Sequence, residues 1–146
     1  IAELRPKKIY FLGDLFHSVL NREWYDFLQF LDVHPKVDFT LVEGNHDIIK
    51  QYPERLRVVR KLNEYPFSFT HHEDVDEIFY NFSGHVHPGI SLYGKAREGI
   101  TLPCFVFGKE AAMLPAFGQF TGLKKIKPEK TDAVFVVAEG SVFRMQ

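Results

Sequence analysis

Short apolar runs alternate with polar turns along this chain, and the first three patterned segments predict a βαβ unit. The continuous apolar run 9–12 is typical of a buried strand and ends at Gly13-Asp14. Between residues 19 and 32, apolar side chains recur every three or four positions, which predicts one apolar face of a helix. A second apolar run, 37–42, ends at Gly44-Asn45. Two strands joined in this way lie parallel, so we expect their carboxyl ends to meet at one edge of a sheet.

Beyond residue 50 the pattern changes to short strand candidates separated by Gly, Pro, Asn or charged turns. The turn Glu139-Gly140-Ser141 predicts a tight hairpin between the last two candidates. Residues 110–128, rich in Gly, Pro and Lys, give no readable pattern. The pattern predicts a single α/β domain over residues 1–146, with an antiparallel, strand-rich second half and two packed sheets. The candidate strands are residues 56–62, 67–70, 78–83, 89–93, 100–107, 133–138 and 142–145.

Composition narrows the class of protein. The 146 residues suffice for one domain with a real core, and no run approaches the ~20 apolar residues of a membrane span. A net charge of -1 argues against a protein that holds DNA by bulk charge alone. The single cysteine, Cys104, is predicted to be a buried core residue, and a cytoplasmic location is the default. Residues 1–8 resemble the end of a helix, and the first residue is Ile rather than Met. We therefore expect the sequence to begin inside a secondary-structure element.

Residues with metal-binding or proton-transferring side chains follow the ends of the predicted strands. Asp14 and Asn45 each follow a strand, and open α/β sheets bind ligands beyond the carboxyl ends of their strands. Either residue alone has a simpler interpretation as a turn or helix-capping residue. Six of the 7 histidines also follow a predicted strand closely: His17, His46, His71, His72, His85 and His87.

Each cluster has its own chemistry. The Asp14 carboxylate can bridge two cations, and Asn45 supplies a neutral oxygen. His46 can carry a proton near neutral pH, and Asp47 could hold its imidazole by one nitrogen. In Gly84-His85-Val86-His87 the glycine and the following Pro88-Gly89 predict a turn that aims both imidazoles at neighbouring metal ions.

These blocks resemble the calcineurin-like metallophosphoesterase superfamily, whose pattern is Asp-x-His, Gly-Asp, Gly-Asn-His-Asp or -Glu, a histidine, and Gly-His-x-His. The second, third and fifth blocks match along the whole chain. The fourth should follow the run 67–70, so His71 is the better candidate and His72 the runner-up. The first block is absent, which the resemblance implies is a truncation before Ile1. The implied fold is a two-sheet metallophosphoesterase sandwich with flanking helices, here lacking its first strand and most of its first helix.

A closer likeness is to the bacterial ligase-associated DNA damage response endonucleases of this superfamily. It implies a role in DNA repair, with DNA as substrate and an ATP-dependent DNA ligase, a helicase and an exonuclease-like protein as neighbours. It is carried by Gly13-Asp14-Leu15-Phe16-His17-Ser18, Gly84-His85-Val86-His87-Pro88-Gly89, Leu102-Pro103-Cys104-Phe105 and Leu114-Pro115-Ala116-Phe117-Gly118-Gln119-Phe120-Thr121-Gly122.

The resemblance implies a two-metal site. Asp14 would bridge, Asn45, His71 and His85 would complete the second metal, and His87 would belong to the first. Nitrogen and oxygen ligands without thiolate favour Mn²⁺, with Fe, Zn or Mg as alternatives. His46 would act at the leaving oxygen, oriented by Asp47. His17 would contact the substrate or lie in the shell around the ligands, with a helix-start residue as the other interpretation.

Two further functions stay open: a phosphoesterase for a small substrate such as a nucleotide, which the near-zero charge mildly favours, and a non-catalytic scaffold on this fold. Lys124-Lys125-Ile126-Lys127 is interpreted as a solvated loop that could make a minor phosphate contact. For residues 1–146 alone we expect one tightly bound metal or none, no turnover, and self-association through an unpaired sheet edge.

Overall fold

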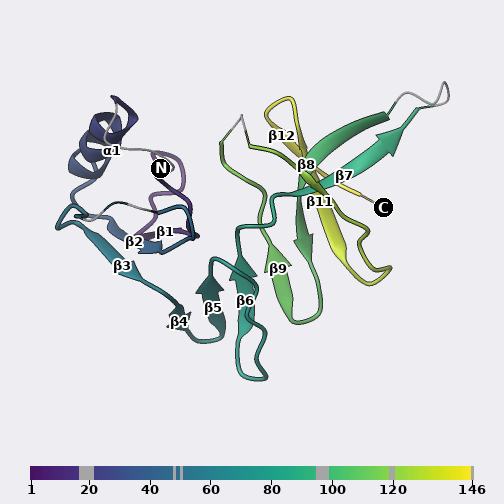
Figure 1. Cartoon of the computed structure of the whole chain (residues 1–146), viewed down its shortest axis with the longest axis horizontal. Coiled ribbons are helices and arrows are strands. Elements are labelled where there is room, and N and C mark those ends of the chain that lie inside the picture. The colour runs from purple at the N-terminus through teal and green to yellow at the C-terminus, as the bar shows by residue number, and fades with distance from the viewer. Residues whose placement is uncertain (17–21, 48, 50, 95–98, 119–120, 146) are drawn as a thin grey trace.

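The computed structural model describes residues 1–16, 22–47, 49, 51–94, 99–118 and 121–145. Their strands form two separate sheets, one small and parallel and one large and mixed (Figure 1). A single helix of the described residues covers the small sheet. The α/β class and the two-sheet architecture are therefore confirmed.

The first lobe is the predicted βαβ unit, extended by one strand. Its three strands pair in parallel in the order β1-β2-β3, and the helix packs its apolar face on them. Leu31 is the most buried helix residue, and Phe39 and Leu41 of the central strand are buried beneath the helix. The predicted helix start at residue 19 lies outside the described residues. The elements are β1 (Lys8–Phe11), α1 (Arg22–Asp32), β2 (Asp38–Val42) and β3 (Leu56–Val59).

The second lobe is a 9-stranded sheet whose main path runs β10-β7-β8-β9-β6-β5-β4, with β11 pairing both β8 and β12. Its core gathers around Cys104, which is fully buried as predicted, and burial raises the pKa of its thiol. The strands are β4 (Leu62–Glu64), β5 (Phe67–Thr70), β6 (Tyr80–Ser83), β7 (Pro88–Tyr93), β8 (Gly99–Phe107), β9 (Ala111–Met113), β10 (Lys124–Lys125), β11 (Ala133–Ala138) and β12 (Ser141–Arg144).

Three expectations for this half were wrong in part. The predicted strand 56–62 is split, its start joining the first sheet as β3 and its end the second as β4. The half is mixed rather than antiparallel, because β5 with β6, β6 with β9 and β10 with β7 pair in parallel. The lysine segment is not all loop, since Lys124 and Lys125 form β10.

The last hairpin is confirmed. β11 and β12 pair antiparallel with Ala138 opposite Ser141, so the loop has two residues. Glu139 and Gly140 both have positive φ, 50° and 73°, which is the backbone of a two-residue turn whose twist matches its strands.

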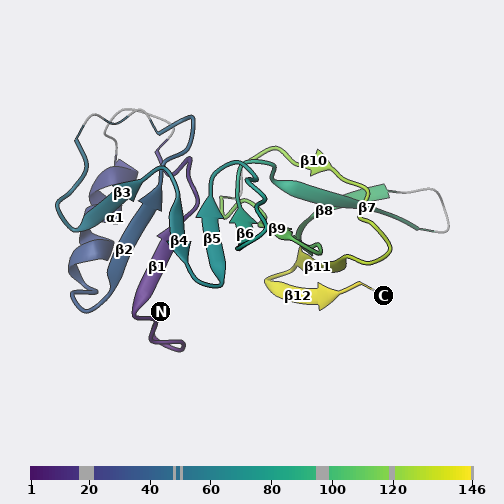
Figure 2. The same cartoon turned by 90° about the horizontal axis from the view of Figure 1, so that it is seen from below.

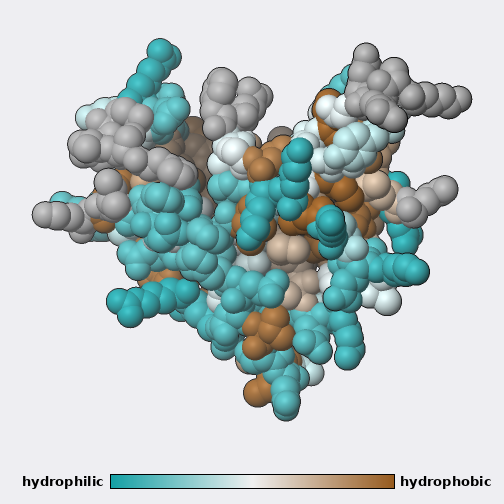
Figure 3. All heavy atoms as spheres, turned by 45° about the vertical axis from the view of Figure 1, so that its right-hand side comes forward, coloured by the Kyte–Doolittle hydropathy of each residue, from teal (hydrophilic) through white to brown (hydrophobic). Residues whose placement is uncertain are grey.

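The surface carries scattered apolar side chains. Figure 3 shows a largely hydrophilic face with an apolar patch to the right of its centre. No helix among the described residues combines the length and apolar character that crossing a bilayer requires.

The arrangement of strands brings four turns to one edge. In Figure 2, β1, β2, β5 and β6 all point upward, so the residues that follow each strand lie at the same side of the molecule. The two sheets meet beside β1, where the Tyr10 and Phe69 rings lie 4.9 Å apart and Lys8 pairs with Glu64 at 2.6 Å. The turns after these four strands contain the polar residues that the sequence singled out.

Candidate metal centre

Side chains from three different turns converge on one nitrogen atom of a fourth residue, His71. His71 Nε2 lies 3.0 Å from Asn45 Oδ1, 3.1 Å from His85 Nδ1 and 3.3 Å from Asp14 Oδ2. The turns follow β2, β6 and β1, and His71 itself follows β5 directly. The structure thus brings together the four residues expected to hold the second metal.

The proton on His71 shows why this cluster fits a cation. Nδ1 of His71 lies 2.8 Å from the Leu12 carbonyl oxygen. A carbonyl only accepts hydrogen bonds, so Nδ1 carries a proton, and when the ring is neutral Nε2 presents a lone pair. That lone pair faces the oxygen atoms of Asp14 and Asn45, which are acceptors as well. In that form the acceptors need a proton or a metal ion between them, and the donor set is one that divalent metals bind.

The backbone at the centre is held in an uncommon conformation. Asp14, His85 and His87 have φ of 54°, 50° and 49°, the left-handed region that non-glycine residues rarely adopt. Each such residue costs about 1–2 kcal/mol. Such strain clusters at functional sites, where the surrounding structure holds it in place. The expected turn at Gly84-His85-Val86-His87 is present between β6 and β7.

Two glycines let the turns approach closely. A Cβ atom on Gly13, whose φ is 88°, would collide with the His71 ring and lie 2.8 Å from Cα of Gly44. A Cβ atom on Gly44 would collide with Asp14. The ligands can therefore meet only because neither position carries a side chain.

Asp47 organises the loops of the centre. Its carboxylate is buried and accepts four backbone N–H bonds: Oδ2 from Asp14 and Gly44, both at 2.8 Å, and Oδ1 from Leu15 at 2.8 Å and Phe16 at 3.0 Å. These bonds use the acceptor positions of both oxygens. They give Asp47 the task of joining the Asp14 turn to the Asn45 turn, and its expected bond to the His46 ring stays a prediction.

His46 lies at the exposed rim of the centre. Its backbone N–H donates to Asp14 Oδ1 at 2.9 Å, so Asp14 holds the His46 loop with one oxygen and faces His71 with the other. This fixes the loop from which the His46 side chain projects.

The other histidines take different places. His72 is exposed, and its ring centroid lies 3.9 Å from that of His85, so it adjoins the cluster on its exposed side. Ligand atoms of His71, His72 and His85 lie within 4.8 Å of one another, a group that in the described residues does not include His87. Burial, with the neighbouring imidazoles, lowers the pKa of His85, which favours the neutral form that binds metals. His17 lies outside the described residues.

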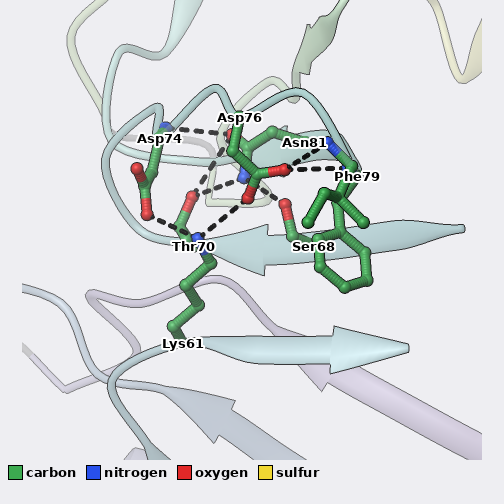
Figure 4. A network of polar contacts seen from close by, with 8 residues as sticks. Lys61, Ser68, Thr70, Asp74, Asp76, Phe79 and Asn81 are labelled. Atoms are coloured by element: carbon green, nitrogen blue, oxygen red, sulfur yellow. Dashed lines mark hydrogen bonds and ion pairs between the residues drawn. The ribbon is translucent and has the colours of Figure 1, made fainter. Parts of the chain in front are cut away.

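A buried polar network supports the turn that follows β5 (Figure 4). Asn81 of β6 is fully buried, and its Nδ2 donates to Ser68 Oγ at 3.0 Å and Thr70 Oγ1 at 2.9 Å. Its Oδ1 accepts from the Asp74 backbone at 3.2 Å. Thr70 and Asp74 flank the His71 turn, so one amide ties both sides of this turn to the neighbouring strand.

Charged groups close the outer side of the same turn. Lys61 pairs with Asp74 at 2.8 Å and with Asp76 at 3.4 Å. Hydrogen bonds from the backbone of Phe79 and Ile78 lower the pKa of the Asp76 carboxyl group. The turn after β5 is thereby fixed at its surface end as well as at its buried end.

The comparisons with known proteins agree with this geometry. The family model for calcineurin-like phosphoesterases matches residues 1–138. The chain belongs to this family. A similar solved structure is that of the Pseudomonas putida nuclease MPE, with a TM-score of 0.83 and 26% identity, covering 99% of this chain and 74% of that chain. No curated protein matches the chain.

Membership makes this phosphoesterase a metal-dependent hydrolase, and its described residues fit the divalent metal ions that the family uses. The four converging donors are nitrogen and oxygen atoms in a partly buried cluster, with the His71 tautomer fixed by Leu12. The broader of the two resemblances seen in the sequence is confirmed, and the nuclease similarity is consistent with the narrower one.

The sequence indicated Asp47 as a partner of His46 but not as the residue that joins two loops of this phosphoesterase, and it gave little signal for Asn81. The role of Asp47 in joining two loops depends on contacts across 33 positions of the chain. Asn81 had a weak signal, because Asn81 and Ser83 are the polar residues on the buried face of β6. A polar residue at an inward strand position often marks a buried hydrogen-bond network.

Proposed function

We propose that this phosphoesterase is a phosphodiesterase that cleaves DNA through a two-metal site, in the context of DNA repair. The observation that carries the proposal is the convergence of Asp14, Asn45 and His85 on the lone pair of His71 Nε2. The nuclease similarity supports a nucleic-acid substrate, and the likeness to ligase-associated endonucleases supports repair. The family pattern assigns the other ion to Asp14, His87 and an Asp-x-His block that this sequence does not contain.

Each residue has a distinct task in the proposed mechanism. Asp14, Asn45, His71 and His85 would hold one ion, for which Mn²⁺ suits the donor set best. Divalent ions in such sites act as Lewis acids toward the phosphoryl group. His46, on a loop fixed by Asp14, would donate a proton to the leaving oxygen or stabilise its charge. Asp47 would hold the two turns that carry Asp14 and Asn45 in a fixed position relative to each other.

We also propose a cellular location and functional partners for this enzyme. From the family likeness, we infer a cytoplasmic location and functional partners among a DNA ligase, a helicase and an exonuclease-like protein. A small-substrate phosphoesterase is the second candidate, favoured by the net charge of -1. A scaffold without catalysis is disfavoured, because the four donors are present and oriented.

Replacing His46 by glutamine tests the catalytic step. In the full-length protein with Mn²⁺, we expect hydrolysis of an aryl phosphodiester to fall about 10²-fold or more, since a positioned acid is worth this much. Metal content, measured by mass spectrometry, should stay the same because the ring is not one of the four converging donors. His34→Gln, at the far end of α1, is the matched control and should keep full turnover. Full turnover in the His46→Gln protein would remove His46 from the mechanism.

A substrate panel separates the two candidate functions. We expect the full-length protein with Mn²⁺ to cleave DNA oligonucleotides, with the products resolved by gel electrophoresis. Robust hydrolysis of nucleotides with no cut in single- or double-stranded DNA would favour the small-substrate phosphoesterase.

A further inference from the structure

Three imidazole rings meet on the exposed side of the metal centre. The ligand atoms of His71, His72 and His85 lie within 4.8 Å of one another. His71 and His85 belong to the four converging donors, whereas His72 is exposed and lies outside that set. The centre therefore has a third imidazole at its solvent side that the four-donor arrangement does not use.

The three rings are tilted against one another rather than stacked in parallel. The interplanar angles are 81° between His71 and His72, 51° between His72 and His85, and 73° between His71 and His85. Tilted rings can each direct one nitrogen toward a shared point, which rings in a parallel stack cannot do. His71 Nε2 and His85 Nδ1 are 3.1 Å apart. Two nitrogens bound at about 2 Å to a tetrahedral ion are separated by about 3.3 Å, so this pair already has the spacing of two such ligands.

The His72 side chain can adjust to join this pair. It is exposed, and among the described residues no hydrogen bond or ion pair holds its ring. Its nitrogen can therefore move toward the other two without breaking a polar contact. The His71 ring, in contrast, is fixed through Nδ1 by the Leu12 carbonyl, which leaves Nε2 as its single ligand atom.

Two overlapping donor sets follow from this arrangement, and they suit different metals. Asp14 and Asn45 add oxygen atoms to the shared imidazoles, and carboxylate and carbonyl oxygens suit Mn²⁺. His72 adds a third imidazole instead, and three histidines with one open position form a common Zn²⁺ set. Because the single ligand atom of His71 belongs to both sets, it can serve only one ion at a time.

We propose that His71, His72 and His85 form a Zn²⁺-binding set that overlaps the Mn²⁺ ligands, so that zinc and manganese exclude each other at this centre. His72 is the ligand that distinguishes the two sets, because the pattern of ligands in the resemblance assigns only one histidine to this turn. The inference concerns metal binding alone and does not depend on which phosphate ester the enzyme cleaves. The zinc level around the protein would thereby control how much of the centre is available to manganese.

The zinc affinity of the full-length apoprotein, measured by competition with a chromophoric chelator, tests the third ligand. We expect His72→Ala to weaken the binding of one zinc ion about 10-fold or more, because even groups that only orient a metal ligand contribute 10–100-fold. The Mn²⁺ affinity, measured from the electron paramagnetic resonance signal of free Mn²⁺, should stay near the wild-type value. His72→Cys should restore zinc binding, since a thiolate binds zinc. His34→Ala, which removes a histidine that follows α1, is the matched control and should change neither affinity.

Two further measurements test the overlap of the sets. Asn45→Ala should weaken Mn²⁺ binding more than Zn²⁺ binding, because Asn45 belongs only to the oxygen-rich set. Zinc added to the wild-type protein loaded with Mn²⁺ should release manganese, seen as a growing signal of free Mn²⁺. Zinc binding without this release would show that the ions do not share ligands and would overturn the proposal. Wild-type zinc affinity in the His72→Ala protein, or equal losses of zinc and manganese affinity, would overturn it as well.

Discussion

Replacing Asp47 by alanine is expected to lower the free energy of unfolding by about 3–5 kcal/mol, even without metal. The carboxylate accepts four backbone N–H bonds from two loops, and each unpaired buried donor costs about 1–3 kcal/mol. Water can reach part of this region, so the sum is smaller than four full penalties. Urea unfolding followed by circular dichroism measures the change.

Two variants make the Asp47 test specific. Asp47→Asn keeps one acceptor oxygen and should lose about half as much stability. Asp38→Ala removes an exposed carboxylate from β2 and should stay within about 0.5 kcal/mol of the wild type. The Asp47→Ala protein could instead show the wild-type urea midpoint and an unchanged slope of unfolding free energy against urea. In that case the four hydrogen bonds do not organise the loops.

Changing His71 to alanine should weaken Mn²⁺ binding by more than about 10²-fold, since even residues that only orient metal ligands contribute 10–100-fold. Nε2 of His71 is the atom on which the other three donors converge. Phosphodiester hydrolysis should fall with metal occupancy. Isothermal titration calorimetry with Mn²⁺ gives the affinity, and activity at rising Mn²⁺ shows whether turnover follows it.

The neighbouring His72 provides the matched control. It is the same residue type in the same turn, but it is exposed and borders the cluster from the side of His85. His72→Ala should therefore keep most of the Mn²⁺ affinity. The reverse order of effects, with His72→Ala losing the metal and His71→Ala keeping it, would exchange the roles of the two histidines.

The sequence predicted the edge of the sheets at which the candidate site lies. Apolar runs that stop at Asp14, Asn45, His71 and His85 identify buried strands, and parallel pairing carries their ends to one side. Apolar side chains at every second position show that a segment is a strand, but they do not show whether it pairs parallel or antiparallel with its neighbour. The parallel pairing of β5 with β6 depends on a long connection through Asp74 and Asp76, and no pattern of apolar residues reports it.

Other features depend on contacts between distant residues. β9 has three residues, two of them alanines, and β10 has two lysines; because both residue types are depleted in strands, neither segment predicts one. Each exists because a neighbouring strand supplies hydrogen bonds. The loop-joining role of Asp47 similarly requires that the Asp14 and Asn45 turns already lie side by side.

The left-handed conformations of Asp14, His85 and His87 also bear on how this protein can change during evolution. Asparagine adopts this conformation more readily than histidine does, so at positions 85 and 87 it would relieve backbone strain while removing an imidazole that we propose binds a metal ion. Mutations that improve stability and mutations that preserve chemistry therefore compete at the same positions. A lineage released from its catalytic role would drift toward a more stable and inactive fold, and the histidines persist only while selection acts on turnover.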